Sequence, residues 1–332
     1  SRGVGDVYKR QIYKSLEEAC QALGVEVTDV PRDDRPHPVP LADGSSKTDG
    51  RIRLFTNNDG GWVQNWRLGS DKALFFPDYG KTLTPEERKQ KNAELEKAKQ
   101  EAREKTRWAF SKAKQKIMKI YQAGRMAAAS NPYLQRKGVK PKGIIKTLNL
   151  NELEELAGYS LFGGKGKFAD GEILIIPRGN NKEGITTLEL IDQNGNKTYF
   201  KNGKLAGAYW LTNKIPAPGV NQTIGICEGV ATALSIHQSA GISAVSVGGC
   251  TNFENCTAEI KERYPEARLI ILGDVGNGEK AARECARKFS ISVCIPAFSE
   301  EHRKRFKELN GNDKEPTDFN DLEQISSKEI TP

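Results

Sequence analysis

Long apolar runs are missing from this sequence of 332 residues, of which 37% are hydrophobic and 28% are charged. No run approaches the roughly 20 apolar residues that a membrane-spanning helix needs. The beginning of the sequence also lacks the apolar core of a secretory signal. The apolar content is nevertheless sufficient for a folded core. We therefore expect a cytoplasmic protein without a membrane partner.

Cysteine and histidine patterns that hold metals are missing as well. The six cysteines contain no CxxC pair, and the three histidines do not lie at zinc-binding spacing from them. Because zinc sites need such spacings, we expect no zinc site, no histidine-based triad, and reduced thiols. Three cysteines lie in apolar stretches, and we expect them in the core: Cys227, Cys285 and Cys294.

Acidic residues are fewer than basic ones, and the basic excess is concentrated in one segment. The chain carries 51 Lys and Arg against 43 Asp and Glu, a net charge of +8. Pro85, with Thr84 and Glu87 at capping-box spacing, predicts a helix that begins at this proline. Nothing breaks the helical pattern until Gly124, which gives roughly 40 residues and about 60 Å of helix.

The second half of this predicted helix carries charge of one sign. Between Glu104 and Met126 there are seven basic residues and no acidic ones, with Trp108, Phe110 and Tyr121 interleaved. Two interpretations stay open. One is a solvated helix face, and the other is a surface that tracks nucleic-acid phosphates.

The amino-terminal part is expected to contain an artefact and a small unit. Residues 1–11, SRGVGDVYKRQ, resemble a translated sequencing-adapter remnant and are expected to lie outside the fold. Residues 12–82 are expected to form a small α+β unit with a short helix that Gly24 ends, a loop over 31–49, and a β-hairpin over 51–68 with an NNDGG turn. Its aromatic residues have two open interpretations, a small core or a platform for stacking bases: Trp62, Trp66, Phe75, Phe76 and Tyr79.

After the basic helix and linker, expected over 83–130, the sequence changes character twice. Residues 131–220 begin with a basic connector and then read as strands and turns, including a DQNGNK hairpin turn. Residues 221–325 alternate short apolar strands with amphipathic helical segments, which is typical of a parallel sheet with helices on its faces. Residues 326–332 are expected to form a tail.

Two of these apolar strands end in carboxylates. Glu228 ends TIGICE, and Asp274 ends RLIILGD. Because functional groups collect at the carboxyl ends of parallel strands, we expect both acids at the same edge of the sheet. A strand-end glutamate by itself is more often a solvent-facing cap. The GDVGNG turn also has two open interpretations, a plain turn into a helix or a phosphate cradle.

The two carboxylate motifs, ICEGVATAL and IILGDVGNGEKAA, resemble a Toprim domain, the catalytic fold of bacterial-type DNA primases, of type IA and II topoisomerases and of some nucleases. Further motifs are similar, in order, to the Toprim primases of phages, plasmids and integrated elements: NPYLQRKGVKP, LIIPRG, KTYFKNGKLAG, VSVGGCTNF and EPTDFNDL. The resemblance covers roughly residues 130–325. It implies an α/β fold with a Rossmann-like parallel sheet and flanking helices, preceded by a small mixed α+β subdomain.

The resemblance implies roles for four acidic residues as ligands of Mg²⁺ or Mn²⁺. Glu228 is similar to the Toprim glutamate, a general acid or base in phosphoryl transfer, and Asp274 to the first acid of the DxDxG motif. The second acid of that motif is Gly276 here, which departs from the family pattern. Asp318 and Asp321, in TDFNDL, are similar to a further acidic motif of primases and are expected to complete the metal site. Asp318 also has a second interpretation, as the cap of a helix.

The resemblance also implies basic residues that bind nucleic acid and nucleotides. Lys201 is similar to a position of the basic ridge that holds template and nucleotide in these primases. Four other residues are carried over with it: Lys197, Lys204, Arg178 and Lys280. The connector and the basic helix are expected to track the DNA template through a further set: Arg136, Lys137, Lys112, Lys116 and Lys119.

Joining nucleotides requires deprotonation of a 3′-hydroxyl and neutralisation of charge on the phosphorus, which Mg²⁺ held by a few carboxylates achieves. Together with this chemistry, the resemblance implies a DNA primase of a mobile element that makes short RNA or mixed primers from NTPs on single-stranded DNA, in a bacterium or a phage-infected cell. Two alternatives stay open: a Toprim nuclease, and a single-strand DNA-binding accessory protein whose site has decayed at Gly276. No GxxxxGK[ST] motif is present, so a helicase is expected as a separate chain or outside these residues.

Overall fold

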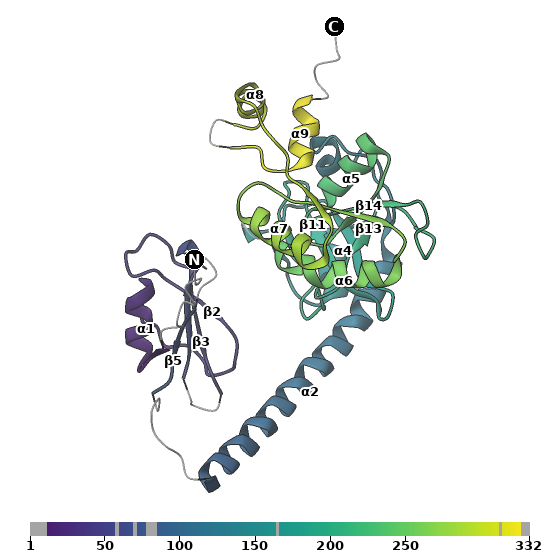
Figure 1. Ribbon diagram of the computed structural model, residues 1–332. Helices are drawn as coiled ribbons and strands as arrows, with labels where there is room; N and C mark the ends of the chain where they lie inside the picture. The colour runs from purple at the N-terminus through teal and green to yellow at the C-terminus, as the bar shows by residue number, and fades with distance from the viewer. Residues whose placement is uncertain are drawn as a thin grey trace. The chain divides into compact units, whose positions relative to one another are not determined.

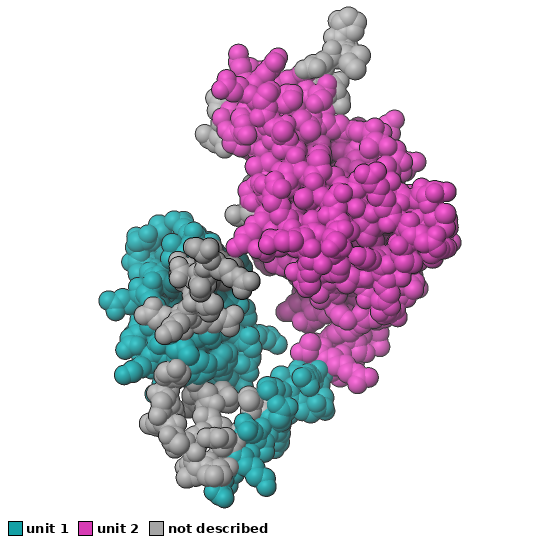
Figure 2. All heavy atoms as spheres, in the orientation of Figure 1, with its two compact units in different colours: residues 1–105 teal, residues 106–332 magenta. Residues whose placement is uncertain are grey.

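The computed structural model describes residues 12–56, 60–68, 72–77, 85–163, 166–311 and 314–326. The chain divides into two compact units, residues 1–105 and residues 106–332 (Figure 2). The expected adapter remnant, most of the NNDGG turn, Thr84, Tyr79 and the tail after Ser326 lie outside the described residues. Among the described helices, none combines the length and the apolar character that a bilayer crossing requires.

The first unit contains a five-stranded sheet with helix α1 packed against it (Figure 1). The strand order is β1-β5-β4-β3-β2, with β1 (Ile12–Tyr13), β2 (His37–Val39), β3 (Gly50–Leu54), β4 (Gly61–Asn65) and β5 (Lys72–Phe75). Helix α1 (Leu16–Leu23) begins at the Ser15 cap and ends at Gly24 in the left-handed conformation. The expected helix and hairpin are confirmed, but the loop expected over 31–49 is wrong in part because it contains the edge strand β2.

The aromatic residues of this unit divide between core and surface. Phe75 is 3% exposed and packs in the core with α1, and Trp62 is 8% exposed, with the Lys72 ammonium 4.2 Å from its ring centroid. Trp66, in the 3-10 turn η1 (Trp66–Leu68), is 54% exposed. A small core therefore accounts for Phe75 and Trp62, which disfavours a base-stacking platform at these two positions.

Helix α2 (Pro85–Ala123) begins at the expected proline and continues into the second unit. There a second sheet has the order β12-β11-β10-β7-β6, with β6 (Arg125–Met126), β7 (Lys146–Asn149), β10 (Glu172–Asn180), β11 (Gly184–Ile191) and β12 (Lys197–Tyr199). Its neighbouring strands are antiparallel. Ala113, Ile117 and Ile120 form an apolar stripe on α2 that packs, with α4 (Leu150–Ala157), against one face of this sheet.

The third sheet contains the parallel strands that the sequence predicts. Its order is β13-β15-β14-β16-β17, with β13 (Trp210–Leu211), β14 (Thr223–Cys227), β15 (Ser243–Ser246), β16 (Arg268–Leu272) and β17 (Ser292–Cys294). Strands β14 to β17 are parallel, whereas β13 pairs antiparallel with β15. The second unit is thus mixed α/β, with several sheets and helices.

Helices cover both faces of the third sheet (Figure 1). The remaining elements are α3 (Pro132–Arg136), β8 (Phe162–Gly163), β9 (Gly166–Lys167), α5 (Val230–Ala240), η2 (Cys250–Asn252), α6 (Phe253–Arg263), α7 (Asn277–Phe289), α8 (Glu300–Asn310) and α9 (Phe319–Ser326). Helices α6 and α7 pack together on one face of the sheet. Helix α5 covers the other face, with α9 against it and α8 against α9.

Strand β10 lies between two apolar layers, which explains its continuous run ILII. Leu174 and Ile176 pack with α5, while Ile173 and Ile175 pack with α2 and α4. A strand buried on both faces needs apolar residues at successive positions rather than at alternate ones. Through α5, this packing joins the second sheet to the third.

The cysteines follow the expectation with one exception. Cys227 and Cys285 are fully buried, as expected. Cys294 is exposed, so its placement in the core is wrong. The run ISVC forms the edge strand β17, in which alternate side chains face outwards.

Candidate active site

The carboxyl ends of β14 and β16 bring two acidic residues to one edge. Glu228 follows β14 directly, and Asp274 follows β16 after Gly273. The two strands are hydrogen-bonded neighbours. A Cβ atom built on Gly278 would lie 3.5 Å from Glu228 Oε2 and 3.4 Å from Asp274 Cβ. Both acidic side chains therefore border the first turn of α7.

The surroundings of the Asp274 carboxyl group disfavour its negative charge. Its Oδ1 is buried and has no hydrogen-bond partner in the described part of the chain. Burial raises the pKa of its carboxyl group from 3.8 to about 7, the Asp318 and Glu228 carboxylates add to this shift, and Lys197 opposes it. A buried carboxylate oxygen without a partner is costly, and a bound cation would remove that cost.

Glu228 lies in a similar environment. Burial raises the pKa of its carboxyl group, the Lys197 ammonium opposes the shift, and the Asp318 and Glu189 carboxylates add to it. Lys197 thus acts on both strand-end acids, and so does Asp318. One exposed cation and three carboxylates share this edge.

Asp318 and Asp321 lie at the start of α9. Asp318 Oδ1 accepts a hydrogen bond from Asp321 N (2.9 Å), and its Oδ2 accepts one from Thr232 Oγ1 (3.1 Å). Asp321 Oδ2 accepts from Thr317 N (2.9 Å), and its Oδ1 lies 3.8 Å from Lys137 Nζ. Asp318 therefore caps the helix and also acts on the strand-end acids, so its two interpretations coexist. Both oxygens of Asp321 have partners within the chain as well, but of the two aspartates it is Asp318 that acts on both Glu228 and Asp274.

The acidic residues lie near one another, but they do not surround a single metal-binding point. Among the described residues, no three Asp, Glu, His or Cys side chains are placed to hold one metal ion together. The orphaned Oδ1 of Asp274 and the mutual repulsion of the carboxylates nevertheless fit a hard divalent cation. Such a cation takes few protein oxygens and completes its shell with water and phosphate. Asp274, Glu228 and Asp318 are the residues that would hold it.

Gly276 departs from the two-acid motif for a backbone reason. It precedes α7 with φ 93° and ψ −130°, a conformation that residues with a side chain rarely adopt. A Cβ atom there would meet nothing within 4 Å, so strain rather than lack of space disfavours a second aspartate. The turn requires a glycine at the position where the family pattern has an acid.

Gly276→Asp is expected to lower the free energy of unfolding by about 1–3 kcal/mol, because the backbone conformation is strained for any residue with a Cβ. Gly276→Ala is the matched control, since it carries the same strain without the charge. Urea denaturation of the parent and both variants measures the effect. Metal-dependent stabilisation that appears only in Gly276→Asp would show instead that the turn relaxes and accepts an acid.

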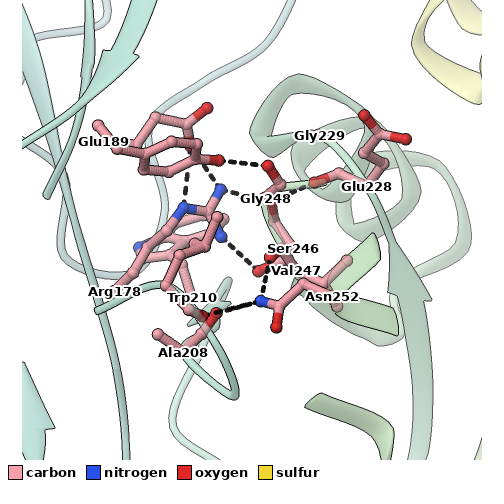
Figure 3. Close-up of polar contacts among 12 residues, drawn as sticks. Arg178, Glu189, Ala208, Trp210, Glu228, Gly229, Ser246, Val247, Gly248 and Asn252 are labelled. Atoms are coloured by element: carbon pink, nitrogen blue, oxygen red, sulfur yellow. Dashed lines mark hydrogen bonds and ion pairs between the residues drawn. The ribbon is translucent and has the colours of Figure 1, made fainter. Parts of the chain in front are cut away.

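The structure corrects the role expected for Arg178. Its side chain is fully buried, with Nε and Nη2 donating to Glu189 Oε2, Nη1 to Ser246 O (2.6 Å) and Nη2 to Ser246 Oγ (2.8 Å) (Figure 3). A guanidinium enclosed in these contacts does not reach a ligand at the sheet edge. Arg178 instead links β10 of the second sheet to β15 of the third.

Ser246 connects this arginine to the candidate catalytic edge. Its Oγ donates to the main-chain oxygen of Glu228 (2.9 Å), and Gly248 N donates to the same oxygen (2.9 Å). The hydroxyl of Tyr199, on β12, donates to Gly248 O. Figure 3 shows these contacts leading from Arg178 to Glu228. The backbone position of Glu228 thus depends on both sheets.

The sequence interpretation missed three members of this network: Glu189, Tyr199 and Asn252. Glu189 is 3% exposed, and its signal was a single acid between two leucines in an apolar strand. Asn252 is 3% exposed and joins the turn after β15 to the loop after β12. Its amide makes hydrogen bonds with four main-chain groups: Leu205 O, Gly207 N, Ala208 O and Val247 O.

The lysines expected to bind nucleotide or template lie in different environments. Lys197, on β12, is exposed and opposes the rise in the pKa values of both strand-end acids. Lys201 is exposed on the loop after β12, and Lys280 is exposed on α7. Lys204 Nζ is paired with Glu183 Oε2 at 2.6 Å. Of these residues, Lys197 is the one that the structure connects electrostatically to the acids.

The residues expected to track DNA are also divided. Lys116 Nζ donates to Ala157 O (2.6 Å) at the end of α4, and Lys137 Nζ lies 3.8 Å from Asp321 Oδ1. These two cations are therefore engaged in the fold. Arg136 is exposed, yet its Nη1 donates to Gln193 O. Lys112 and Lys119 are exposed to solvent.

A cavity of about 350 Å³ lies beside the acids. Lys197, Asp318 and Asp321 line it, together with Arg136 and Tyr133 from α3. The first turn of α5 also borders it, which adds main-chain N–H groups at a helix N-terminus. The cavity thus offers cations for phosphate oxygens next to carboxylates for a metal.

No protein-family model matches the chain. Among curated proteins, the chain is 22% identical over 265 residues to a protein named DNA primase TraC from Escherichia coli, which covers 75% of this chain and 22% of that protein. A second Escherichia coli protein of the same name is 23% identical over 168 residues, covering 49% of this chain and 10% of that protein. The chain therefore spans less than a quarter of the length of these relatives.

Solved structures of primases are also similar, at a greater distance. The primase fragment of the bacteriophage T7 primase-helicase protein is 18% identical, with a TM-score of 0.36 and coverage of 63% of this chain and 74% of that chain. The DnaG primase catalytic domain bound to ssDNA is 12% identical, with a TM-score of 0.36 and coverage of 53% and 66%. The sequence relatives confirm the predicted resemblance of this chain to DNA primases.

Proposed function

We propose that the chain is the catalytic part of a DNA primase, which joins NTPs into short RNA primers on a single-stranded DNA template. One observation carries the proposal: Glu228 and Asp274 end adjacent parallel strands as partly buried acids, and the exposed Lys197 acts on both. Similarity to two proteins named DNA primase supports the same activity.

We assign residues 221–325 to a Toprim domain and residues 131–220 to the preceding subdomain of a primase-type core. The parallel order β15-β14-β16-β17, with helices on both faces and acids after two adjacent strands, supports the first assignment. The second sheet would then present template and nucleotide to the same edge through β12.

A divalent cation, Mg²⁺ or Mn²⁺, when bound would lower the pKa of the attacking 3′-hydroxyl and neutralise charge on the phosphoryl group. Asp274, Glu228 and Asp318 would hold it. Lys197 would bind phosphate oxygens of the NTP, since its ammonium is exposed next to the acids. Burial raises the pKa of the Glu228 carboxyl group, which suits this residue to proton transfer.

The Gly276 turn favours a second candidate function, a single-strand DNA-binding accessory protein without catalysis. The metal site lacks the second acid of the family motif, and the backbone at Gly276 disfavours one. Exposed cations such as Lys112 and Arg136 would serve this function equally well.

The deciding experiment incubates the full chain with labelled NTPs, Mg²⁺ and mixed single-stranded DNA templates. Short labelled RNA on a gel is expected, and removal of the metal with EDTA is expected to abolish it. DNA binding without synthesis on any template would overturn the primase proposal in favour of the accessory protein. Cleavage of the template would point instead to a Toprim nuclease.

We also propose that the chain works with a replicative helicase in a bacterial or phage-infected cytoplasm. Its 332 residues contain no GxxxxGK[ST] motif, so the strand separation that exposes a template has to come from outside them. The check is stimulation of primer synthesis on duplex DNA by an added helicase.

A further inference from the structure

Phe162 is a large apolar side chain left in solvent. It is 62% exposed in the hairpin of β8 and β9, where it pairs with Lys167. The residues at the two ends of the hairpin, Leu161 and Phe168, are 1% and 3% exposed and pack in the core with α4. The hairpin is therefore anchored on both sides. A single exposed aromatic residue is common on protein surfaces, and Phe162 is informative because of the residues around it.

The segments around Phe162 carry cations and no acids. Residues 159–169 and 193–208 contain five Lys between them and no Asp or Glu. In the described part of the chain, the ammonium groups of Lys167, Lys197 and Lys201 have no ion-pair partner, whereas Lys204 is paired. Glu154, on α4, lies at the base of the hairpin, where its Oε1 accepts from the main-chain N of Leu161 (2.6 Å). The exposed Asp170 and the buried Asp192 border the two segments, so lysines outnumber the acids next to them.

The hairpin lies beside the strand that connects to the candidate active site. β8 contacts β12, and a Cβ atom built on Gly163 would lie 2.5 Å from Asn196 Cβ. Asn196 precedes Lys197, the cation that acts on both strand-end acids. A nucleic-acid strand that leaves the acids across β12 therefore meets this hairpin next.

We propose that the β8–β9 hairpin and β12 form a binding surface for single-stranded DNA, in which Phe162 stacks on a base and Lys167 contacts a phosphate. The inference rests on the proposed function, which supplies the reason why a DNA strand lies at this surface. Single-stranded DNA fits because aromatic side chains stack on any base while lysines follow the backbone. A lipid or protein surface would require a wider apolar patch than one phenyl ring.

The test measures binding of fluorescein-labelled oligothymidylate to the full chain by anisotropy, without NTPs and at several salt concentrations. Phe162→Ala is expected to weaken binding about 5- to 100-fold at every salt concentration, because stacking releases no counterions. Lys167→Gln is expected to reduce the slope of log K against log salt by about 0.7, the value of one phosphate contact on a single strand.

Matched variants separate stacking from general effects. Phe162→Trp keeps a ring and is expected to retain the affinity. Val220→Ala, at a residue 52% exposed, and Lys214→Gln, at an exposed lysine, both precede β14 and so lie at the opposite edge of the third sheet. Both are expected to bind like the parent. An abasic oligodeoxynucleotide keeps the phosphates without the bases, and the parent and Phe162→Ala are expected to bind it equally.

Unchanged oligothymidylate affinity in Phe162→Ala overturns the proposal, and so does an equal loss on the abasic strand. Tighter binding of an RNA oligomer than of DNA in the same assay would overturn the assignment to single-stranded DNA. The readout does not depend on synthesis. A chain that binds DNA through Phe162 but makes no RNA would sink the primase proposal and leave this surface standing.

Discussion

Asp274→Asn is expected to abolish RNA synthesis and, without metal, to make the protein more stable than its parent at neutral pH. Loss of a carboxylate that holds the cation is expected to lower the rate by at least about 100-fold. In the absence of a cation, the same carboxylate lowers the stability of the folded protein. Its Oδ1 is buried without a partner, and Asp318 and Glu228 repel its charge. The amide keeps the shape and removes the charge.

The pH dependence of this effect has a definite sign. The pKa of Asp274 is about 7 in the folded protein against an ordinary 3.8, so the folded state holds the proton more tightly. Its stabilising contribution is present in full below 3.8 and is lost as the pH rises through about 7. Without metal at about pH 8, the variant is expected to gain on the order of 1–3 kcal/mol over the parent.

Urea unfolding between about pH 4 and pH 8, with and without Mg²⁺ or Mn²⁺, measures this difference. Metal is expected to raise the unfolding midpoint of the parent at the higher pH and to leave that of Asp274→Asn unchanged. Glu266→Gln, at an exposed acid just before β16, is the control and is expected to behave as the parent. A variant less stable than the parent at the higher pH would contradict the cation site.

Replacing both Arg178 and Glu189 by methionine is expected to leave the protein folded but to slow RNA synthesis. Arg178→Met alone leaves the Glu189 charge buried without a partner, which is expected to cost about 3–5 kcal/mol of unfolding free energy. The double variant is expected to recover most of that loss, because apolar residues often replace a buried ion pair without net cost. Synthesis does not recover, since Ser246 loses the guanidinium that holds it against the Glu228 backbone.

For the double variant we expect kcat to fall about 10- to 100-fold with an unchanged KM for NTP, as for a small misplacement of catalytic groups. Arg178 is a positioning residue, because its side chain is fully buried. Urea unfolding and steady-state synthesis measure the two effects separately. The control replaces Lys182 and Glu262 by methionine, an exposed pair with its atoms 2.8 Å apart, and is expected to change neither. Parental stability together with parental activity in the Arg178 and Glu189 double variant would show that the pair is not needed to position Glu228.

Local patterns are enough to place several helix ends and the two strands that carry the acids. Pro85 begins a helix and Gly24 ends one, because these effects act within one turn of the chain. The apolar runs before Glu228 and Asp274 become adjacent parallel strands, and both acids follow those strands at one edge. Short-range sterics and hydrophobic periodicity therefore carry this part of the prediction. The same rules missed β2 and the exposed Cys294, where an edge strand follows tertiary pairing.

The partners of the charged side chains could not be read from local patterns. Arg178 contacts Glu189, 11 residues away, and Ser246, 68 residues away. The local sequence of an arginine that follows an apolar run is the same whether its side chain faces solvent or pairs with a buried carboxylate. Lys197, on β12, and Lys201, on the loop after it, lie four residues apart, yet of the two it is Lys197 that acts on the acids. Burial and charge at each position come from segments far apart in the sequence, so the role of a charged side chain is decided only when the sheets pack together.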